Sequence, residues 1–473
     1  MTYYLDPLGC VKNQVDAETM MAFLDRSGWT AAAEPERADL IIINSCGFIE
    51  SAKQESINTV IGYRKDYPDK KILLAGCLAQ RYAAALSGSL TEADAFFGNT
   101  DLSRIGEAAA RVMGARDEGV ASAQQQDAAG TAELVPLTDT GSALLGSRPL
   151  LSLPGSAYVK IAEGCNNHCT FCAIPGIRGP LRSRPIPDVV EECRRLLGRG
   201  IKELCLIGQD LGSYGLDRDG NVRGQGPRLP ELLEALSVLD GDFWVRFLYI
   251  HPDNFPLPIL DIIRRDSRFL PYFDIPFQHG SATILKAMNR RGAADSYLAL
   301  VSNIRAALPD AVIRSTFLTG FPGETDDDFH ALLDFQKALD LDWAGAFTYS
   351  REEDTPAYRM KPRVPKKLAA ERKALIEEQQ IPITQKRMDR FVGRTMDVLV
   401  EERISDSPDN SSPLDLSAEE DIYLGRLTCQ APEVDGAAVI SSDDTLVPGA
   451  MVRGRVVARS GVDLSVQIVR SRG

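Results

Sequence analysis

The sequence lacks three features that would place it in other classes of protein. No apolar run approaches the roughly 20 residues of a membrane-spanning helix, so no membrane segment is expected. The first residues do not join a basic stretch to an apolar one, so no secretory signal peptide is expected. Positive charge is not in excess, because the formal net charge is −13 at pH 7. We therefore expect a cytoplasmic protein whose natural partner is a basic protein rather than a polyanion.

The chain is long and contains several cysteines. Its 473 residues, 44% of them hydrophobic, suffice for roughly two to four domains with substantial cores. Nine cysteines in a cytoplasmic protein indicate metal or redox chemistry rather than disulfides. Three of them stand alone and are interpreted as packing residues: Cys193, Cys205 and Cys429. The other six form two sets of three, which is not the pattern of a disulfide framework.

One set lies in a single loop, Gly-Cys-Asn-Asn-His-Cys-Thr-Phe-Cys-Ala-Ile-Pro at residues 164–175. Cys165, Cys169 and Cys172 follow the spacing CxxxCxxC. Four thiolates usually hold an iron–sulfur cluster, so three local ones can bind three corners of a cubane and leave one iron open. An open position is typical of a catalytic metal site. The alternative is a structural zinc site completed by His168 or a distant cysteine, and the surrounding chain favours the cluster.

The first 115 residues alternate between apolar and amphipathic segments. Buried parallel strands are expected at residues 40–44 and 71–76, where the sequence is apolar and partly β-branched. Helices are expected at residues 15–27 and 50–63. This alternation predicts an α/β layered domain with a parallel sheet.

The second set of cysteines lies at the ends of expected strands in this domain. Cys10, Cys46 and Cys77 are far apart in sequence, but sites form where the carboxyl ends of parallel strands meet. Glycine beside each cysteine permits close approach of the backbone to a bulky inorganic group. We expect the three to converge; the alternative is three unrelated small core residues.

A linker and a second α/β block follow. Residues 116–155 are rich in Ala, Gly, Ser, Thr and Gln and are interpreted as a mobile linker, with an ordered irregular segment as the alternative. Residues 156–385 contain repeated β/α units, which favour a barrel with functional groups at the carboxyl ends of its strands. Strands are expected at 203–208, 243–249, 273–277, 311–318 and 343–349, and helices at 187–200, 229–239 and 256–265.

Polar residues follow several of these strands. Gln209 and Asp210 end one strand, and Gly-Phe-Pro-Gly-Glu at residues 320–324 follows another. Two glycines in that string permit close approach to a ligand, and its glutamate can accept hydrogen bonds from ligand hydroxyls. Taken alone, the string is better interpreted as a simple turn. His251 and His279 are given no role, because a single histidine is more often structural.

The last part of the chain, residues 390–473, changes to short strands with turn residues. Strands at 395–401, 452–458 and 464–469 predict a small antiparallel β-barrel, and the charged helix before it, at 366–388, is interpreted as a solvated connector. Residues 391–473 contain eight arginines, no lysine and 14 acidic residues, a net charge of −6. A surface that binds phosphates should carry excess positive charge, so a basic protein partner is favoured over RNA. The alternative is that the acidic residues gather on an unused face or in the loop at 406–421, while a few arginines bind RNA.

The cysteine loop, with an aromatic residue just before its last cysteine, resembles the radical S-adenosylmethionine (SAM) enzymes. The Gly-Phe-Pro-Gly-Glu string resembles the turn that contacts SAM in that family. The resemblance implies a six-stranded partial (β/α) barrel and a 4Fe–4S cluster whose open iron chelates SAM. The residues that it implies are Cys165, Cys169 and Cys172 for the cluster, Phe171 near the adenine, and Gly320 and Glu324 for SAM.

The N-terminal cysteine motifs resemble the methylthiotransferases within that superfamily. The resemblance lies in residues 8–18, 44–49 and 75–79, and it implies that Cys10, Cys46 and Cys77 bind a second 4Fe–4S cluster with its own open iron. Ser45 departs from the threonine more common in the family but keeps the hydroxyl. The C-terminal β-barrel resembles the TRAM domain, a module often associated with RNA.

The resemblance also implies a reaction. One cluster reduces SAM to release a 5′-deoxyadenosyl radical, which removes hydrogen from an unactivated carbon. The second cluster holds sulfur, which another SAM methylates, and a flavodoxin-type protein is an expected electron donor.

Three further strings in the sequence bear on the substrate. The strings at residues 46–56, 274–279 and 431–436 resemble the branch that modifies the β-carbon of an aspartate in small-subunit ribosomal protein twelve. The transfer-RNA branch typically has Met-Asn where this chain has Lys12-Asn13, and another string in place of residues 47–49. Two alternatives stay open: a transfer-RNA adenosine methylthiotransferase, and an iron–sulfur carrier without chemistry of its own, which needs no SAM site.

Overall fold

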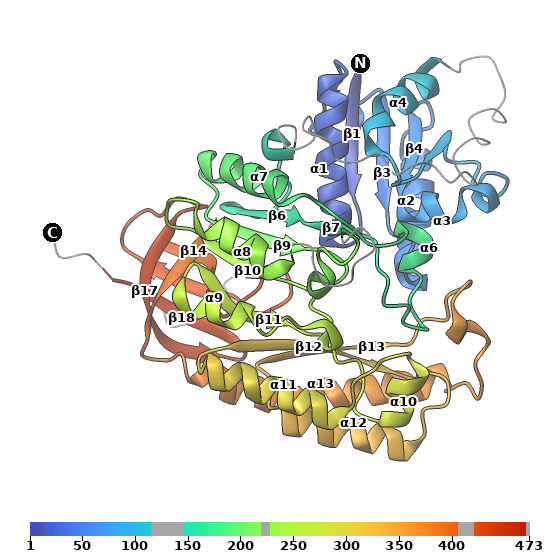
Figure 1. Cartoon of the computed structure of the whole chain (residues 1–473). Helices are drawn as coiled ribbons and strands as arrows, with labels where there is room; N and C mark the ends of the chain where they lie inside the picture. The colour runs from blue at the N-terminus through green and yellow to red at the C-terminus, as the bar shows by residue number, and fades with distance from the viewer. Residues whose placement is uncertain (115–144, 219–227, 405–420, 470–473) are drawn as a thin grey trace.

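The computed structural model describes residues 1–114, 145–218, 228–404 and 421–469, and its main sheets belong to three units along the chain (Figure 1). No helix in these residues is both long and apolar enough to cross a membrane. All nine cysteines are free.

The first unit is a five-stranded parallel sheet in the order β2-β1-β3-β4-β5. Helices cover both of its faces, so all six residues of β3 are buried, as its continuous apolar run predicts. The expected α/β layered domain with a parallel sheet is confirmed. Its elements are β1 Thr2–Pro7, α1 Val11–Arg26, β2 Thr30–Ala31, β3 Leu40–Ser45, α2 Glu50–Asp66, β4 Lys71–Gly76, α3 Cys77–Leu86, β5 Ala95–Phe97 and α4 Ile105–Gly114.

The second unit is a six-stranded sheet in the order β13-β12-β11-β10-β9-β6, in which every neighbouring pair is parallel. The expected partial (β/α) barrel is thus confirmed. Its strands are β6 Ser156–Lys160, β9 Glu203–Ile207, β10 Trp244–Phe247, β11 Phe269–Asp274, β12 Val312–Thr319 and β13 Trp343–Thr348. Its helices include α7 Ile186–Gly198, α8 Leu229–Ser237, α9 Ile259–Arg265, α10 Ala282–Ala287, α11 Ala294–Ala307 and α12 Asp326–Leu339.

Two expectations about this unit are wrong. The strand expected at 273–277 lies earlier, because β11 ends at Asp274 and Pro276 has no N–H to donate to a strand ladder. The helix expected to be a solvated connector is α13 Lys366–Asp389, and it packs along β13 and α12. Its buried residues recur every three or four positions, but half of them are polar, so the sequence pattern did not indicate a buried face. They are Ala369, Arg372, Ile376, Gln380, Thr384 and Met388.

The described end of the expected linker is ordered and buried. Arg148 is fully buried and donates to Glu18 of α1 (2.8 Å) and to Glu192 of α7 (2.5 Å). The segment from residue 145 to 155 therefore ties the first unit to the second, as the alternative interpretation expected. Residues 116–144 of the expected linker lie outside the described residues.

The third unit is a closed barrel in the order β14-β15-β16-β18-β17, which confirms the expected small β-barrel. The expected antiparallel pairing holds for four of its five strand pairs, whereas β16 and β18 pair in parallel. Its strands are β14 Thr395–Arg403, β15 Asp421–Leu427, β16 Ala438–Ser442, β17 Met451–Ser460 and β18 Asp463–Ile468. Nearly all of the expected acidic loop at 406–421 lies outside the described residues. The barrel packs against the amino ends of the second sheet, where the Trp343 indole donates to the Cys429 carbonyl (3.0 Å), and so lies opposite the cysteine loop (Figure 1).

A buried ion pair fixes this docking. Arg426 of β15 donates to Glu203 of β9 and to Glu401 of β14, both at 2.5 Å, and its side chain is 3% exposed. Replacing Arg426 with Met leaves these carboxylates partly uncompensated, so we expect a loss of about 3 kcal/mol in the free energy of unfolding. Arg453→Met is the matched control, because its ion pair with Asp397 is exposed and should cost below about 1 kcal/mol. Urea unfolding followed by circular dichroism measures both, and equal losses would contradict this account.

Candidate active site

The cysteine loop lies at the carboxyl ends of the strands of the second sheet, between the short strand β7 Ala162–Glu163 and helix α6 Ile174–Arg178. Gly164 opens the loop with a φ of 75°, and a Cβ at this position would lie 2.0 Å from the carbonyl oxygen of Pro180. The backbone N–H of Cys165 donates to the Gly179 carbonyl at 3.2 Å. The loop is thus closed at its base by a contact that only glycine permits.

Helix α10 holds the middle of the loop. The backbone N–H of Thr170 donates to Met288 (3.2 Å), and its hydroxyl donates to Ala287 (2.8 Å), both at main-chain carbonyls. The Asn289 side chain donates to the carbonyl of His168 (3.0 Å). These bonds fix the backbone on both sides of the second cysteine, Cys169.

Asp210, which follows β9, organises the start of the loop. Its Oδ2 accepts hydrogen bonds from the side-chain amides of Asn167 (2.8 Å) and Asn254 (2.7 Å). The same amide nitrogen of Asn167 lies 3.4 Å from Sγ of Cys165. The sequence predicts Asp210 at a strand end near the site, and the structure adds that it orients a side chain toward a cysteine sulfur.

The N-terminal cysteines converge as expected. Cys10, Cys46 and Cys77 directly follow or lie close behind β1, β3 and β4, and their thiols are close enough to interact electrostatically with one another. Burial raises the pKa of Cys77 to about 12 and also raises the pKa of Cys46. The thiols of Cys46 and Cys77 therefore stay protonated until a metal displaces their protons.

Two of the glycines beside these cysteines allow the cysteine-bearing loops to pack closely. A Cβ on Gly9 would lie 2.9 Å from Cβ of Cys46, and one on Gly47 would lie 2.7 Å from the carbonyl oxygen of Cys77. These glycines therefore let the loops approach one another. The convergence of the three cysteines depends on this close packing.

Both cysteine sets have the donor chemistry that an iron–sulfur cluster requires. Each presents three free thiols, and soft sulfur ligands suit such clusters. In each set, side-chain N–H groups point at a cysteine sulfur, and such donors stabilise the negative charge of a sulfur that binds metal. They are Asn167 at Cys165, and Asn99 and Arg178 at Cys77. In the described residues, no group of three His, Cys, Asp or Glu side chains gathers around a position for one metal ion.

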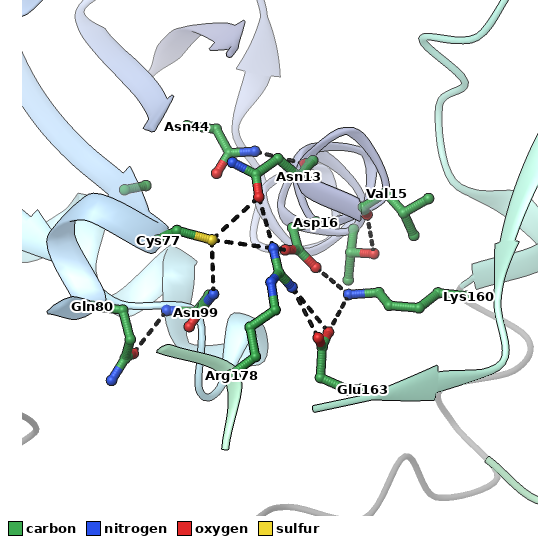
Figure 2. Close-up of polar contacts among 12 residues, drawn as sticks. Asn13, Val15, Asp16, Asn44, Cys77, Gln80, Asn99, Lys160, Glu163 and Arg178 are labelled. Carbon is green, nitrogen blue, oxygen red and sulfur yellow. Dashed lines mark hydrogen bonds and ion pairs between the residues drawn. The ribbon is translucent and has the colours of Figure 1, made fainter. Parts of the chain in front are cut away.

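The two sets meet at the boundary between the first two units. Cys77 packs in one apolar cluster with Ala173, which directly follows Cys172, and with Ile177. Beside this contact, Arg178 of α6 reaches across to helix α1 and to Cys77 (Figure 2). Sequence reasoning missed Arg178; the available signal was a lone arginine in the apolar stretch that follows the cysteine loop.

Phe171 joins the cysteine loop to the Gly-Phe-Pro-Gly-Glu turn. It is half-buried and packs against an apolar cluster that includes Met288 of the α10 end and Phe321 of the turn. The two segments that the sequence predicted for SAM are therefore linked by side-chain packing.

Glu324 lies behind the turn. Its side chain is fully buried, and its two oxygens accept from the backbone N–H of Gly320 (2.9 Å) and from Arg372 of α13 (2.5 Å). His279 Nε2 lies 3.5 Å from the same carboxylate. The carboxylate thus holds the turn against α13.

His251 points at the cysteine loop, a role that sequence reasoning did not give it. Its Nδ1 accepts from the backbone N–H of Asp253 (3.2 Å), so the neutral ring carries its proton on Nε2. That nitrogen lies 3.9 Å from Sγ of Cys169. Burial lowers the pKa of His251 to about 4.

Three family models match the chain. They are described as uncharacterised protein family UPF0004 at residues 2–98, the radical SAM superfamily at residues 159–335, and the TRAM domain at residues 392–469. Together they cover parts of the three structural units.

Full-length relatives are also similar. A protein named ribosomal protein uS12 methylthiotransferase RimO from Treponema denticola is 45% identical, over 98% of this chain and 100% of its own. Proteins of the same name from Clostridioides difficile (38% identical, over 95% of this chain and 94% of that protein) and Carboxydothermus hydrogenoformans (36%, over 99% and 100%) extend this result.

Among solved structures, the radical SAM methyltransferase TsrM from Kitasatospora setae is similar in two forms. The form with tryptophan and a SAM analogue has a TM-score of 0.53, over 73% of this chain and 72% of that chain. The form with cobalamin and a [4Fe-4S] cluster has a TM-score of 0.54, over 75% and 73%. Both are 14% identical to this chain, so the likeness shows the fold alone.

Asp210 gives the first test of the site. Asp210→Ala removes the acceptor that orients Asn167, so we expect at least a roughly 10-fold weaker retention of iron by the cysteine loop. Anaerobic reconstitution followed by iron and sulfide analysis after dilution measures the loss. Asp266→Ala is the control, because that carboxylate precedes β11 at the opposite end of the sheet. Equal iron retention in both variants would contradict the role given to Asp210.

The turn at Gly320 gives the second test of the site. A Cβ at Gly320, where φ is 75°, would lie 2.4 Å from Cβ of Ala369, whereas Gly323, at φ 90°, has open space. Gly323→Ala should lower the free energy of unfolding by about 1 kcal/mol, because the left-handed backbone disfavours a Cβ. Gly320→Ala should lower it by about 1–3 kcal/mol more, because its Cβ overpacks against Ala369. Urea unfolding measures the stability of both variants. An equal loss of stability would show that α13 does not pack tightly against the turn.

Proposed function

Because the chain belongs to the ribosomal protein uS12 methylthiotransferase family, we propose that it attaches a methylthio group to the β-carbon of an aspartate in uS12. One observation carries the proposal: two sets of three free cysteines meet across one boundary, where Cys77 packs against Ala173. An iron–sulfur carrier would not need two converging sets joined to a buried turn of the radical SAM type. The cofactors that the family implies are two 4Fe–4S clusters and SAM.

The ligand assignment follows the two cysteine sets. Cys165, Cys169 and Cys172 hold the cluster that binds SAM, and the N-terminal set holds the other: Cys10, Cys46 and Cys77. When bound, these groups supply a carbon-centred radical and the sulfur that is transferred. Phe171 would lie beside the adenine of SAM, and Gly320 and Glu324 would belong to the turn that contacts it.

The protein orients these groups and limits access of water. Asp210 and Asn167 direct Cys165, and α10 fixes the following residues of the loop. Phe171 packs against the apolar cluster that contains Phe321 of the turn, and this packing would keep water away from SAM bound beside it. Glu324 keeps that turn in place from behind.

The charge of the third unit supports a basic protein as substrate. Five of the six arginines described in residues 391–469 already pair with carboxylates of this chain, namely Arg394, Arg403, Arg426, Arg453 and Arg459. Few positive groups in the described part of this unit are then left for phosphates, and binding to RNA would require them. An acidic surface instead attracts a basic ribosomal protein.

Two further points complete the proposal. Reductive cleavage of SAM consumes an electron, so a low-potential donor such as a flavodoxin-type protein is required. A ribosomal-protein substrate places the reaction in the cytoplasm.

The proposal predicts the products of two cysteine variants. Cys165→Ala should abolish both 5′-deoxyadenosine and methylthio product, because SAM then lacks its cluster. Cys46→Ala should keep the cleavage of SAM but lose the product, because only the sulfur-bearing site is damaged. The assay is anaerobic, contains SAM, a reductant and either uS12 or unmodified transfer RNA, and is read by mass spectrometry, with Cys193→Ala as a control outside both sets.

The outcomes separate the candidates. Methylthiolation of a uS12 aspartate by the unaltered protein supports the proposal. Modification of transfer RNA instead would overturn the substrate, and product from Cys46→Ala would overturn the second cluster. Absence of both 5′-deoxyadenosine and product would point to the carrier.

A further inference from the structure

Arg178 crosses from the radical SAM unit into the N-terminal unit. It ends α6, six residues after Cys172, and its side chain is 3% exposed. Its Nη2 donates to Oδ1 of Asn13 (2.6 Å), to Oδ2 of Asp16 (2.9 Å) and to Sγ of Cys77 (3.2 Å). Figure 2 shows this guanidinium between helix α1, Cys77 and Glu163.

Its charge is held in place from both sides. Asp16 belongs to α1, and Glu163 precedes the cysteine loop and accepts from Nη1 of Arg178 at 3.0 Å. Lys160 pairs with both carboxylates, so two cations and two anions form one network (Figure 2). The guanidinium therefore keeps its orientation toward the sulfur without relying on that contact.

A second donor reaches the same sulfur. The side-chain amide of Asn99, two residues after β5, lies with Nδ2 at 3.4 Å from Sγ of Cys77. Cys77 also begins α3, where the helix dipole favours negative charge. These three features would stabilise a negatively charged, metal-bound sulfur at Cys77. The protonated thiol instead donates to Oδ1 of Asn13 at 3.3 Å.

A comparison within the chain shows which part of this arrangement is special. Arg148 is equally buried, crosses the same boundary and also pairs with two carboxylates, Glu18 and Glu192. Its other partners are the carbonyls of Leu145 and Tyr158, and no hydrogen bond joins it to a sulfur. A buried arginine can therefore tie these units together without contacting a cysteine, and the sulfur contact of Arg178 needs another explanation.

We propose that Arg178, assisted by Asn99, is a positioning residue that raises the reduction potential of the cluster on Cys10, Cys46 and Cys77. This inference rests on the proposed function for the presence of that cluster. Hydrogen bonds to cluster sulfurs and a nearby positive charge stabilise the reduced, more negative state. Because Arg178 follows directly from the cysteine loop, the same residue also holds the second cluster site against the first.

The test isolates the N-terminal cluster. In the full chain, Cys165, Cys169 and Cys172 are replaced together by Ala, so that only the N-terminal cluster gives an electron paramagnetic resonance signal. Arg178→Met, Arg178→Lys and Asn99→Leu are made in this background, with Arg148→Met as the matched control. Each is reconstituted anaerobically, analysed for iron and titrated with a redox dye series.

We expect the midpoint potential to become more negative in Arg178→Met and, by a smaller shift, in Asn99→Leu. Arg178→Lys keeps the charge and should recover part of the shift. Arg148→Met should leave the potential unchanged, because Asp16 still pairs with Lys160 and Arg178 and keeps α1 in place. If Arg178→Met fails to hold a cluster, Asn99→Leu decides, because it removes no buried charge.

The contrary results are distinct. An unchanged potential in Asn99→Leu and in any Arg178 variant that holds a cluster, or an equal shift in Arg148→Met, would overturn this inference alone. Absence of iron from the parent background would overturn the proposed second cluster and this inference with it.

Discussion

The structure depends on buried ion pairs that dock helix α1 against the second sheet. Asp16 pairs with Lys160 and Arg178, and Glu18 pairs with Arg148. Removing such charges from water is costly, so these pairs add little net stability. Any other docking of α1 would leave a buried charge without its partner and is therefore disfavoured. The register between the two units is therefore fixed by charge, and not only by apolar packing.

That register fixes the chemistry, because α1 begins at a cysteine. Cys10 is the residue before the first turn of α1, and the side chain of Asn13 donates to the carbonyl of Ser45 beside Cys46. A helix held by the second sheet thus holds the N-terminal cysteines together and against the cysteine loop. The opposite end of the second sheet is closed by the acidic β-barrel through Arg426, which leaves the carboxyl ends of the strands for the site.

The sequence predicted what depends on local spacing. The cysteine loop, the cysteines behind β1, β3 and β4, and the β/α alternation all follow from neighbours in the chain. It could not predict contacts whose distance in sequence is large, such as that of Arg178 with Asp16, 162 residues apart. The stripe of α13 was missed because half of it is polar. The ion pair of Glu324 with Arg372, 48 residues away, could not be predicted for the same reason as the contact of Arg178.

The most direct measurement compares electron paramagnetic resonance spectra of the reduced protein with both cysteine sets loaded and of two variants with one set each. Cys77 of one set packs against Ala173, which directly follows Cys172 of the other set. Two clusters bound at these sets should therefore be close enough for their spins to interact. The doubly loaded protein should then show broadened signals and faster spin relaxation than the sum of the two single spectra. A spectrum equal to that sum would contradict two neighbouring clusters at one site.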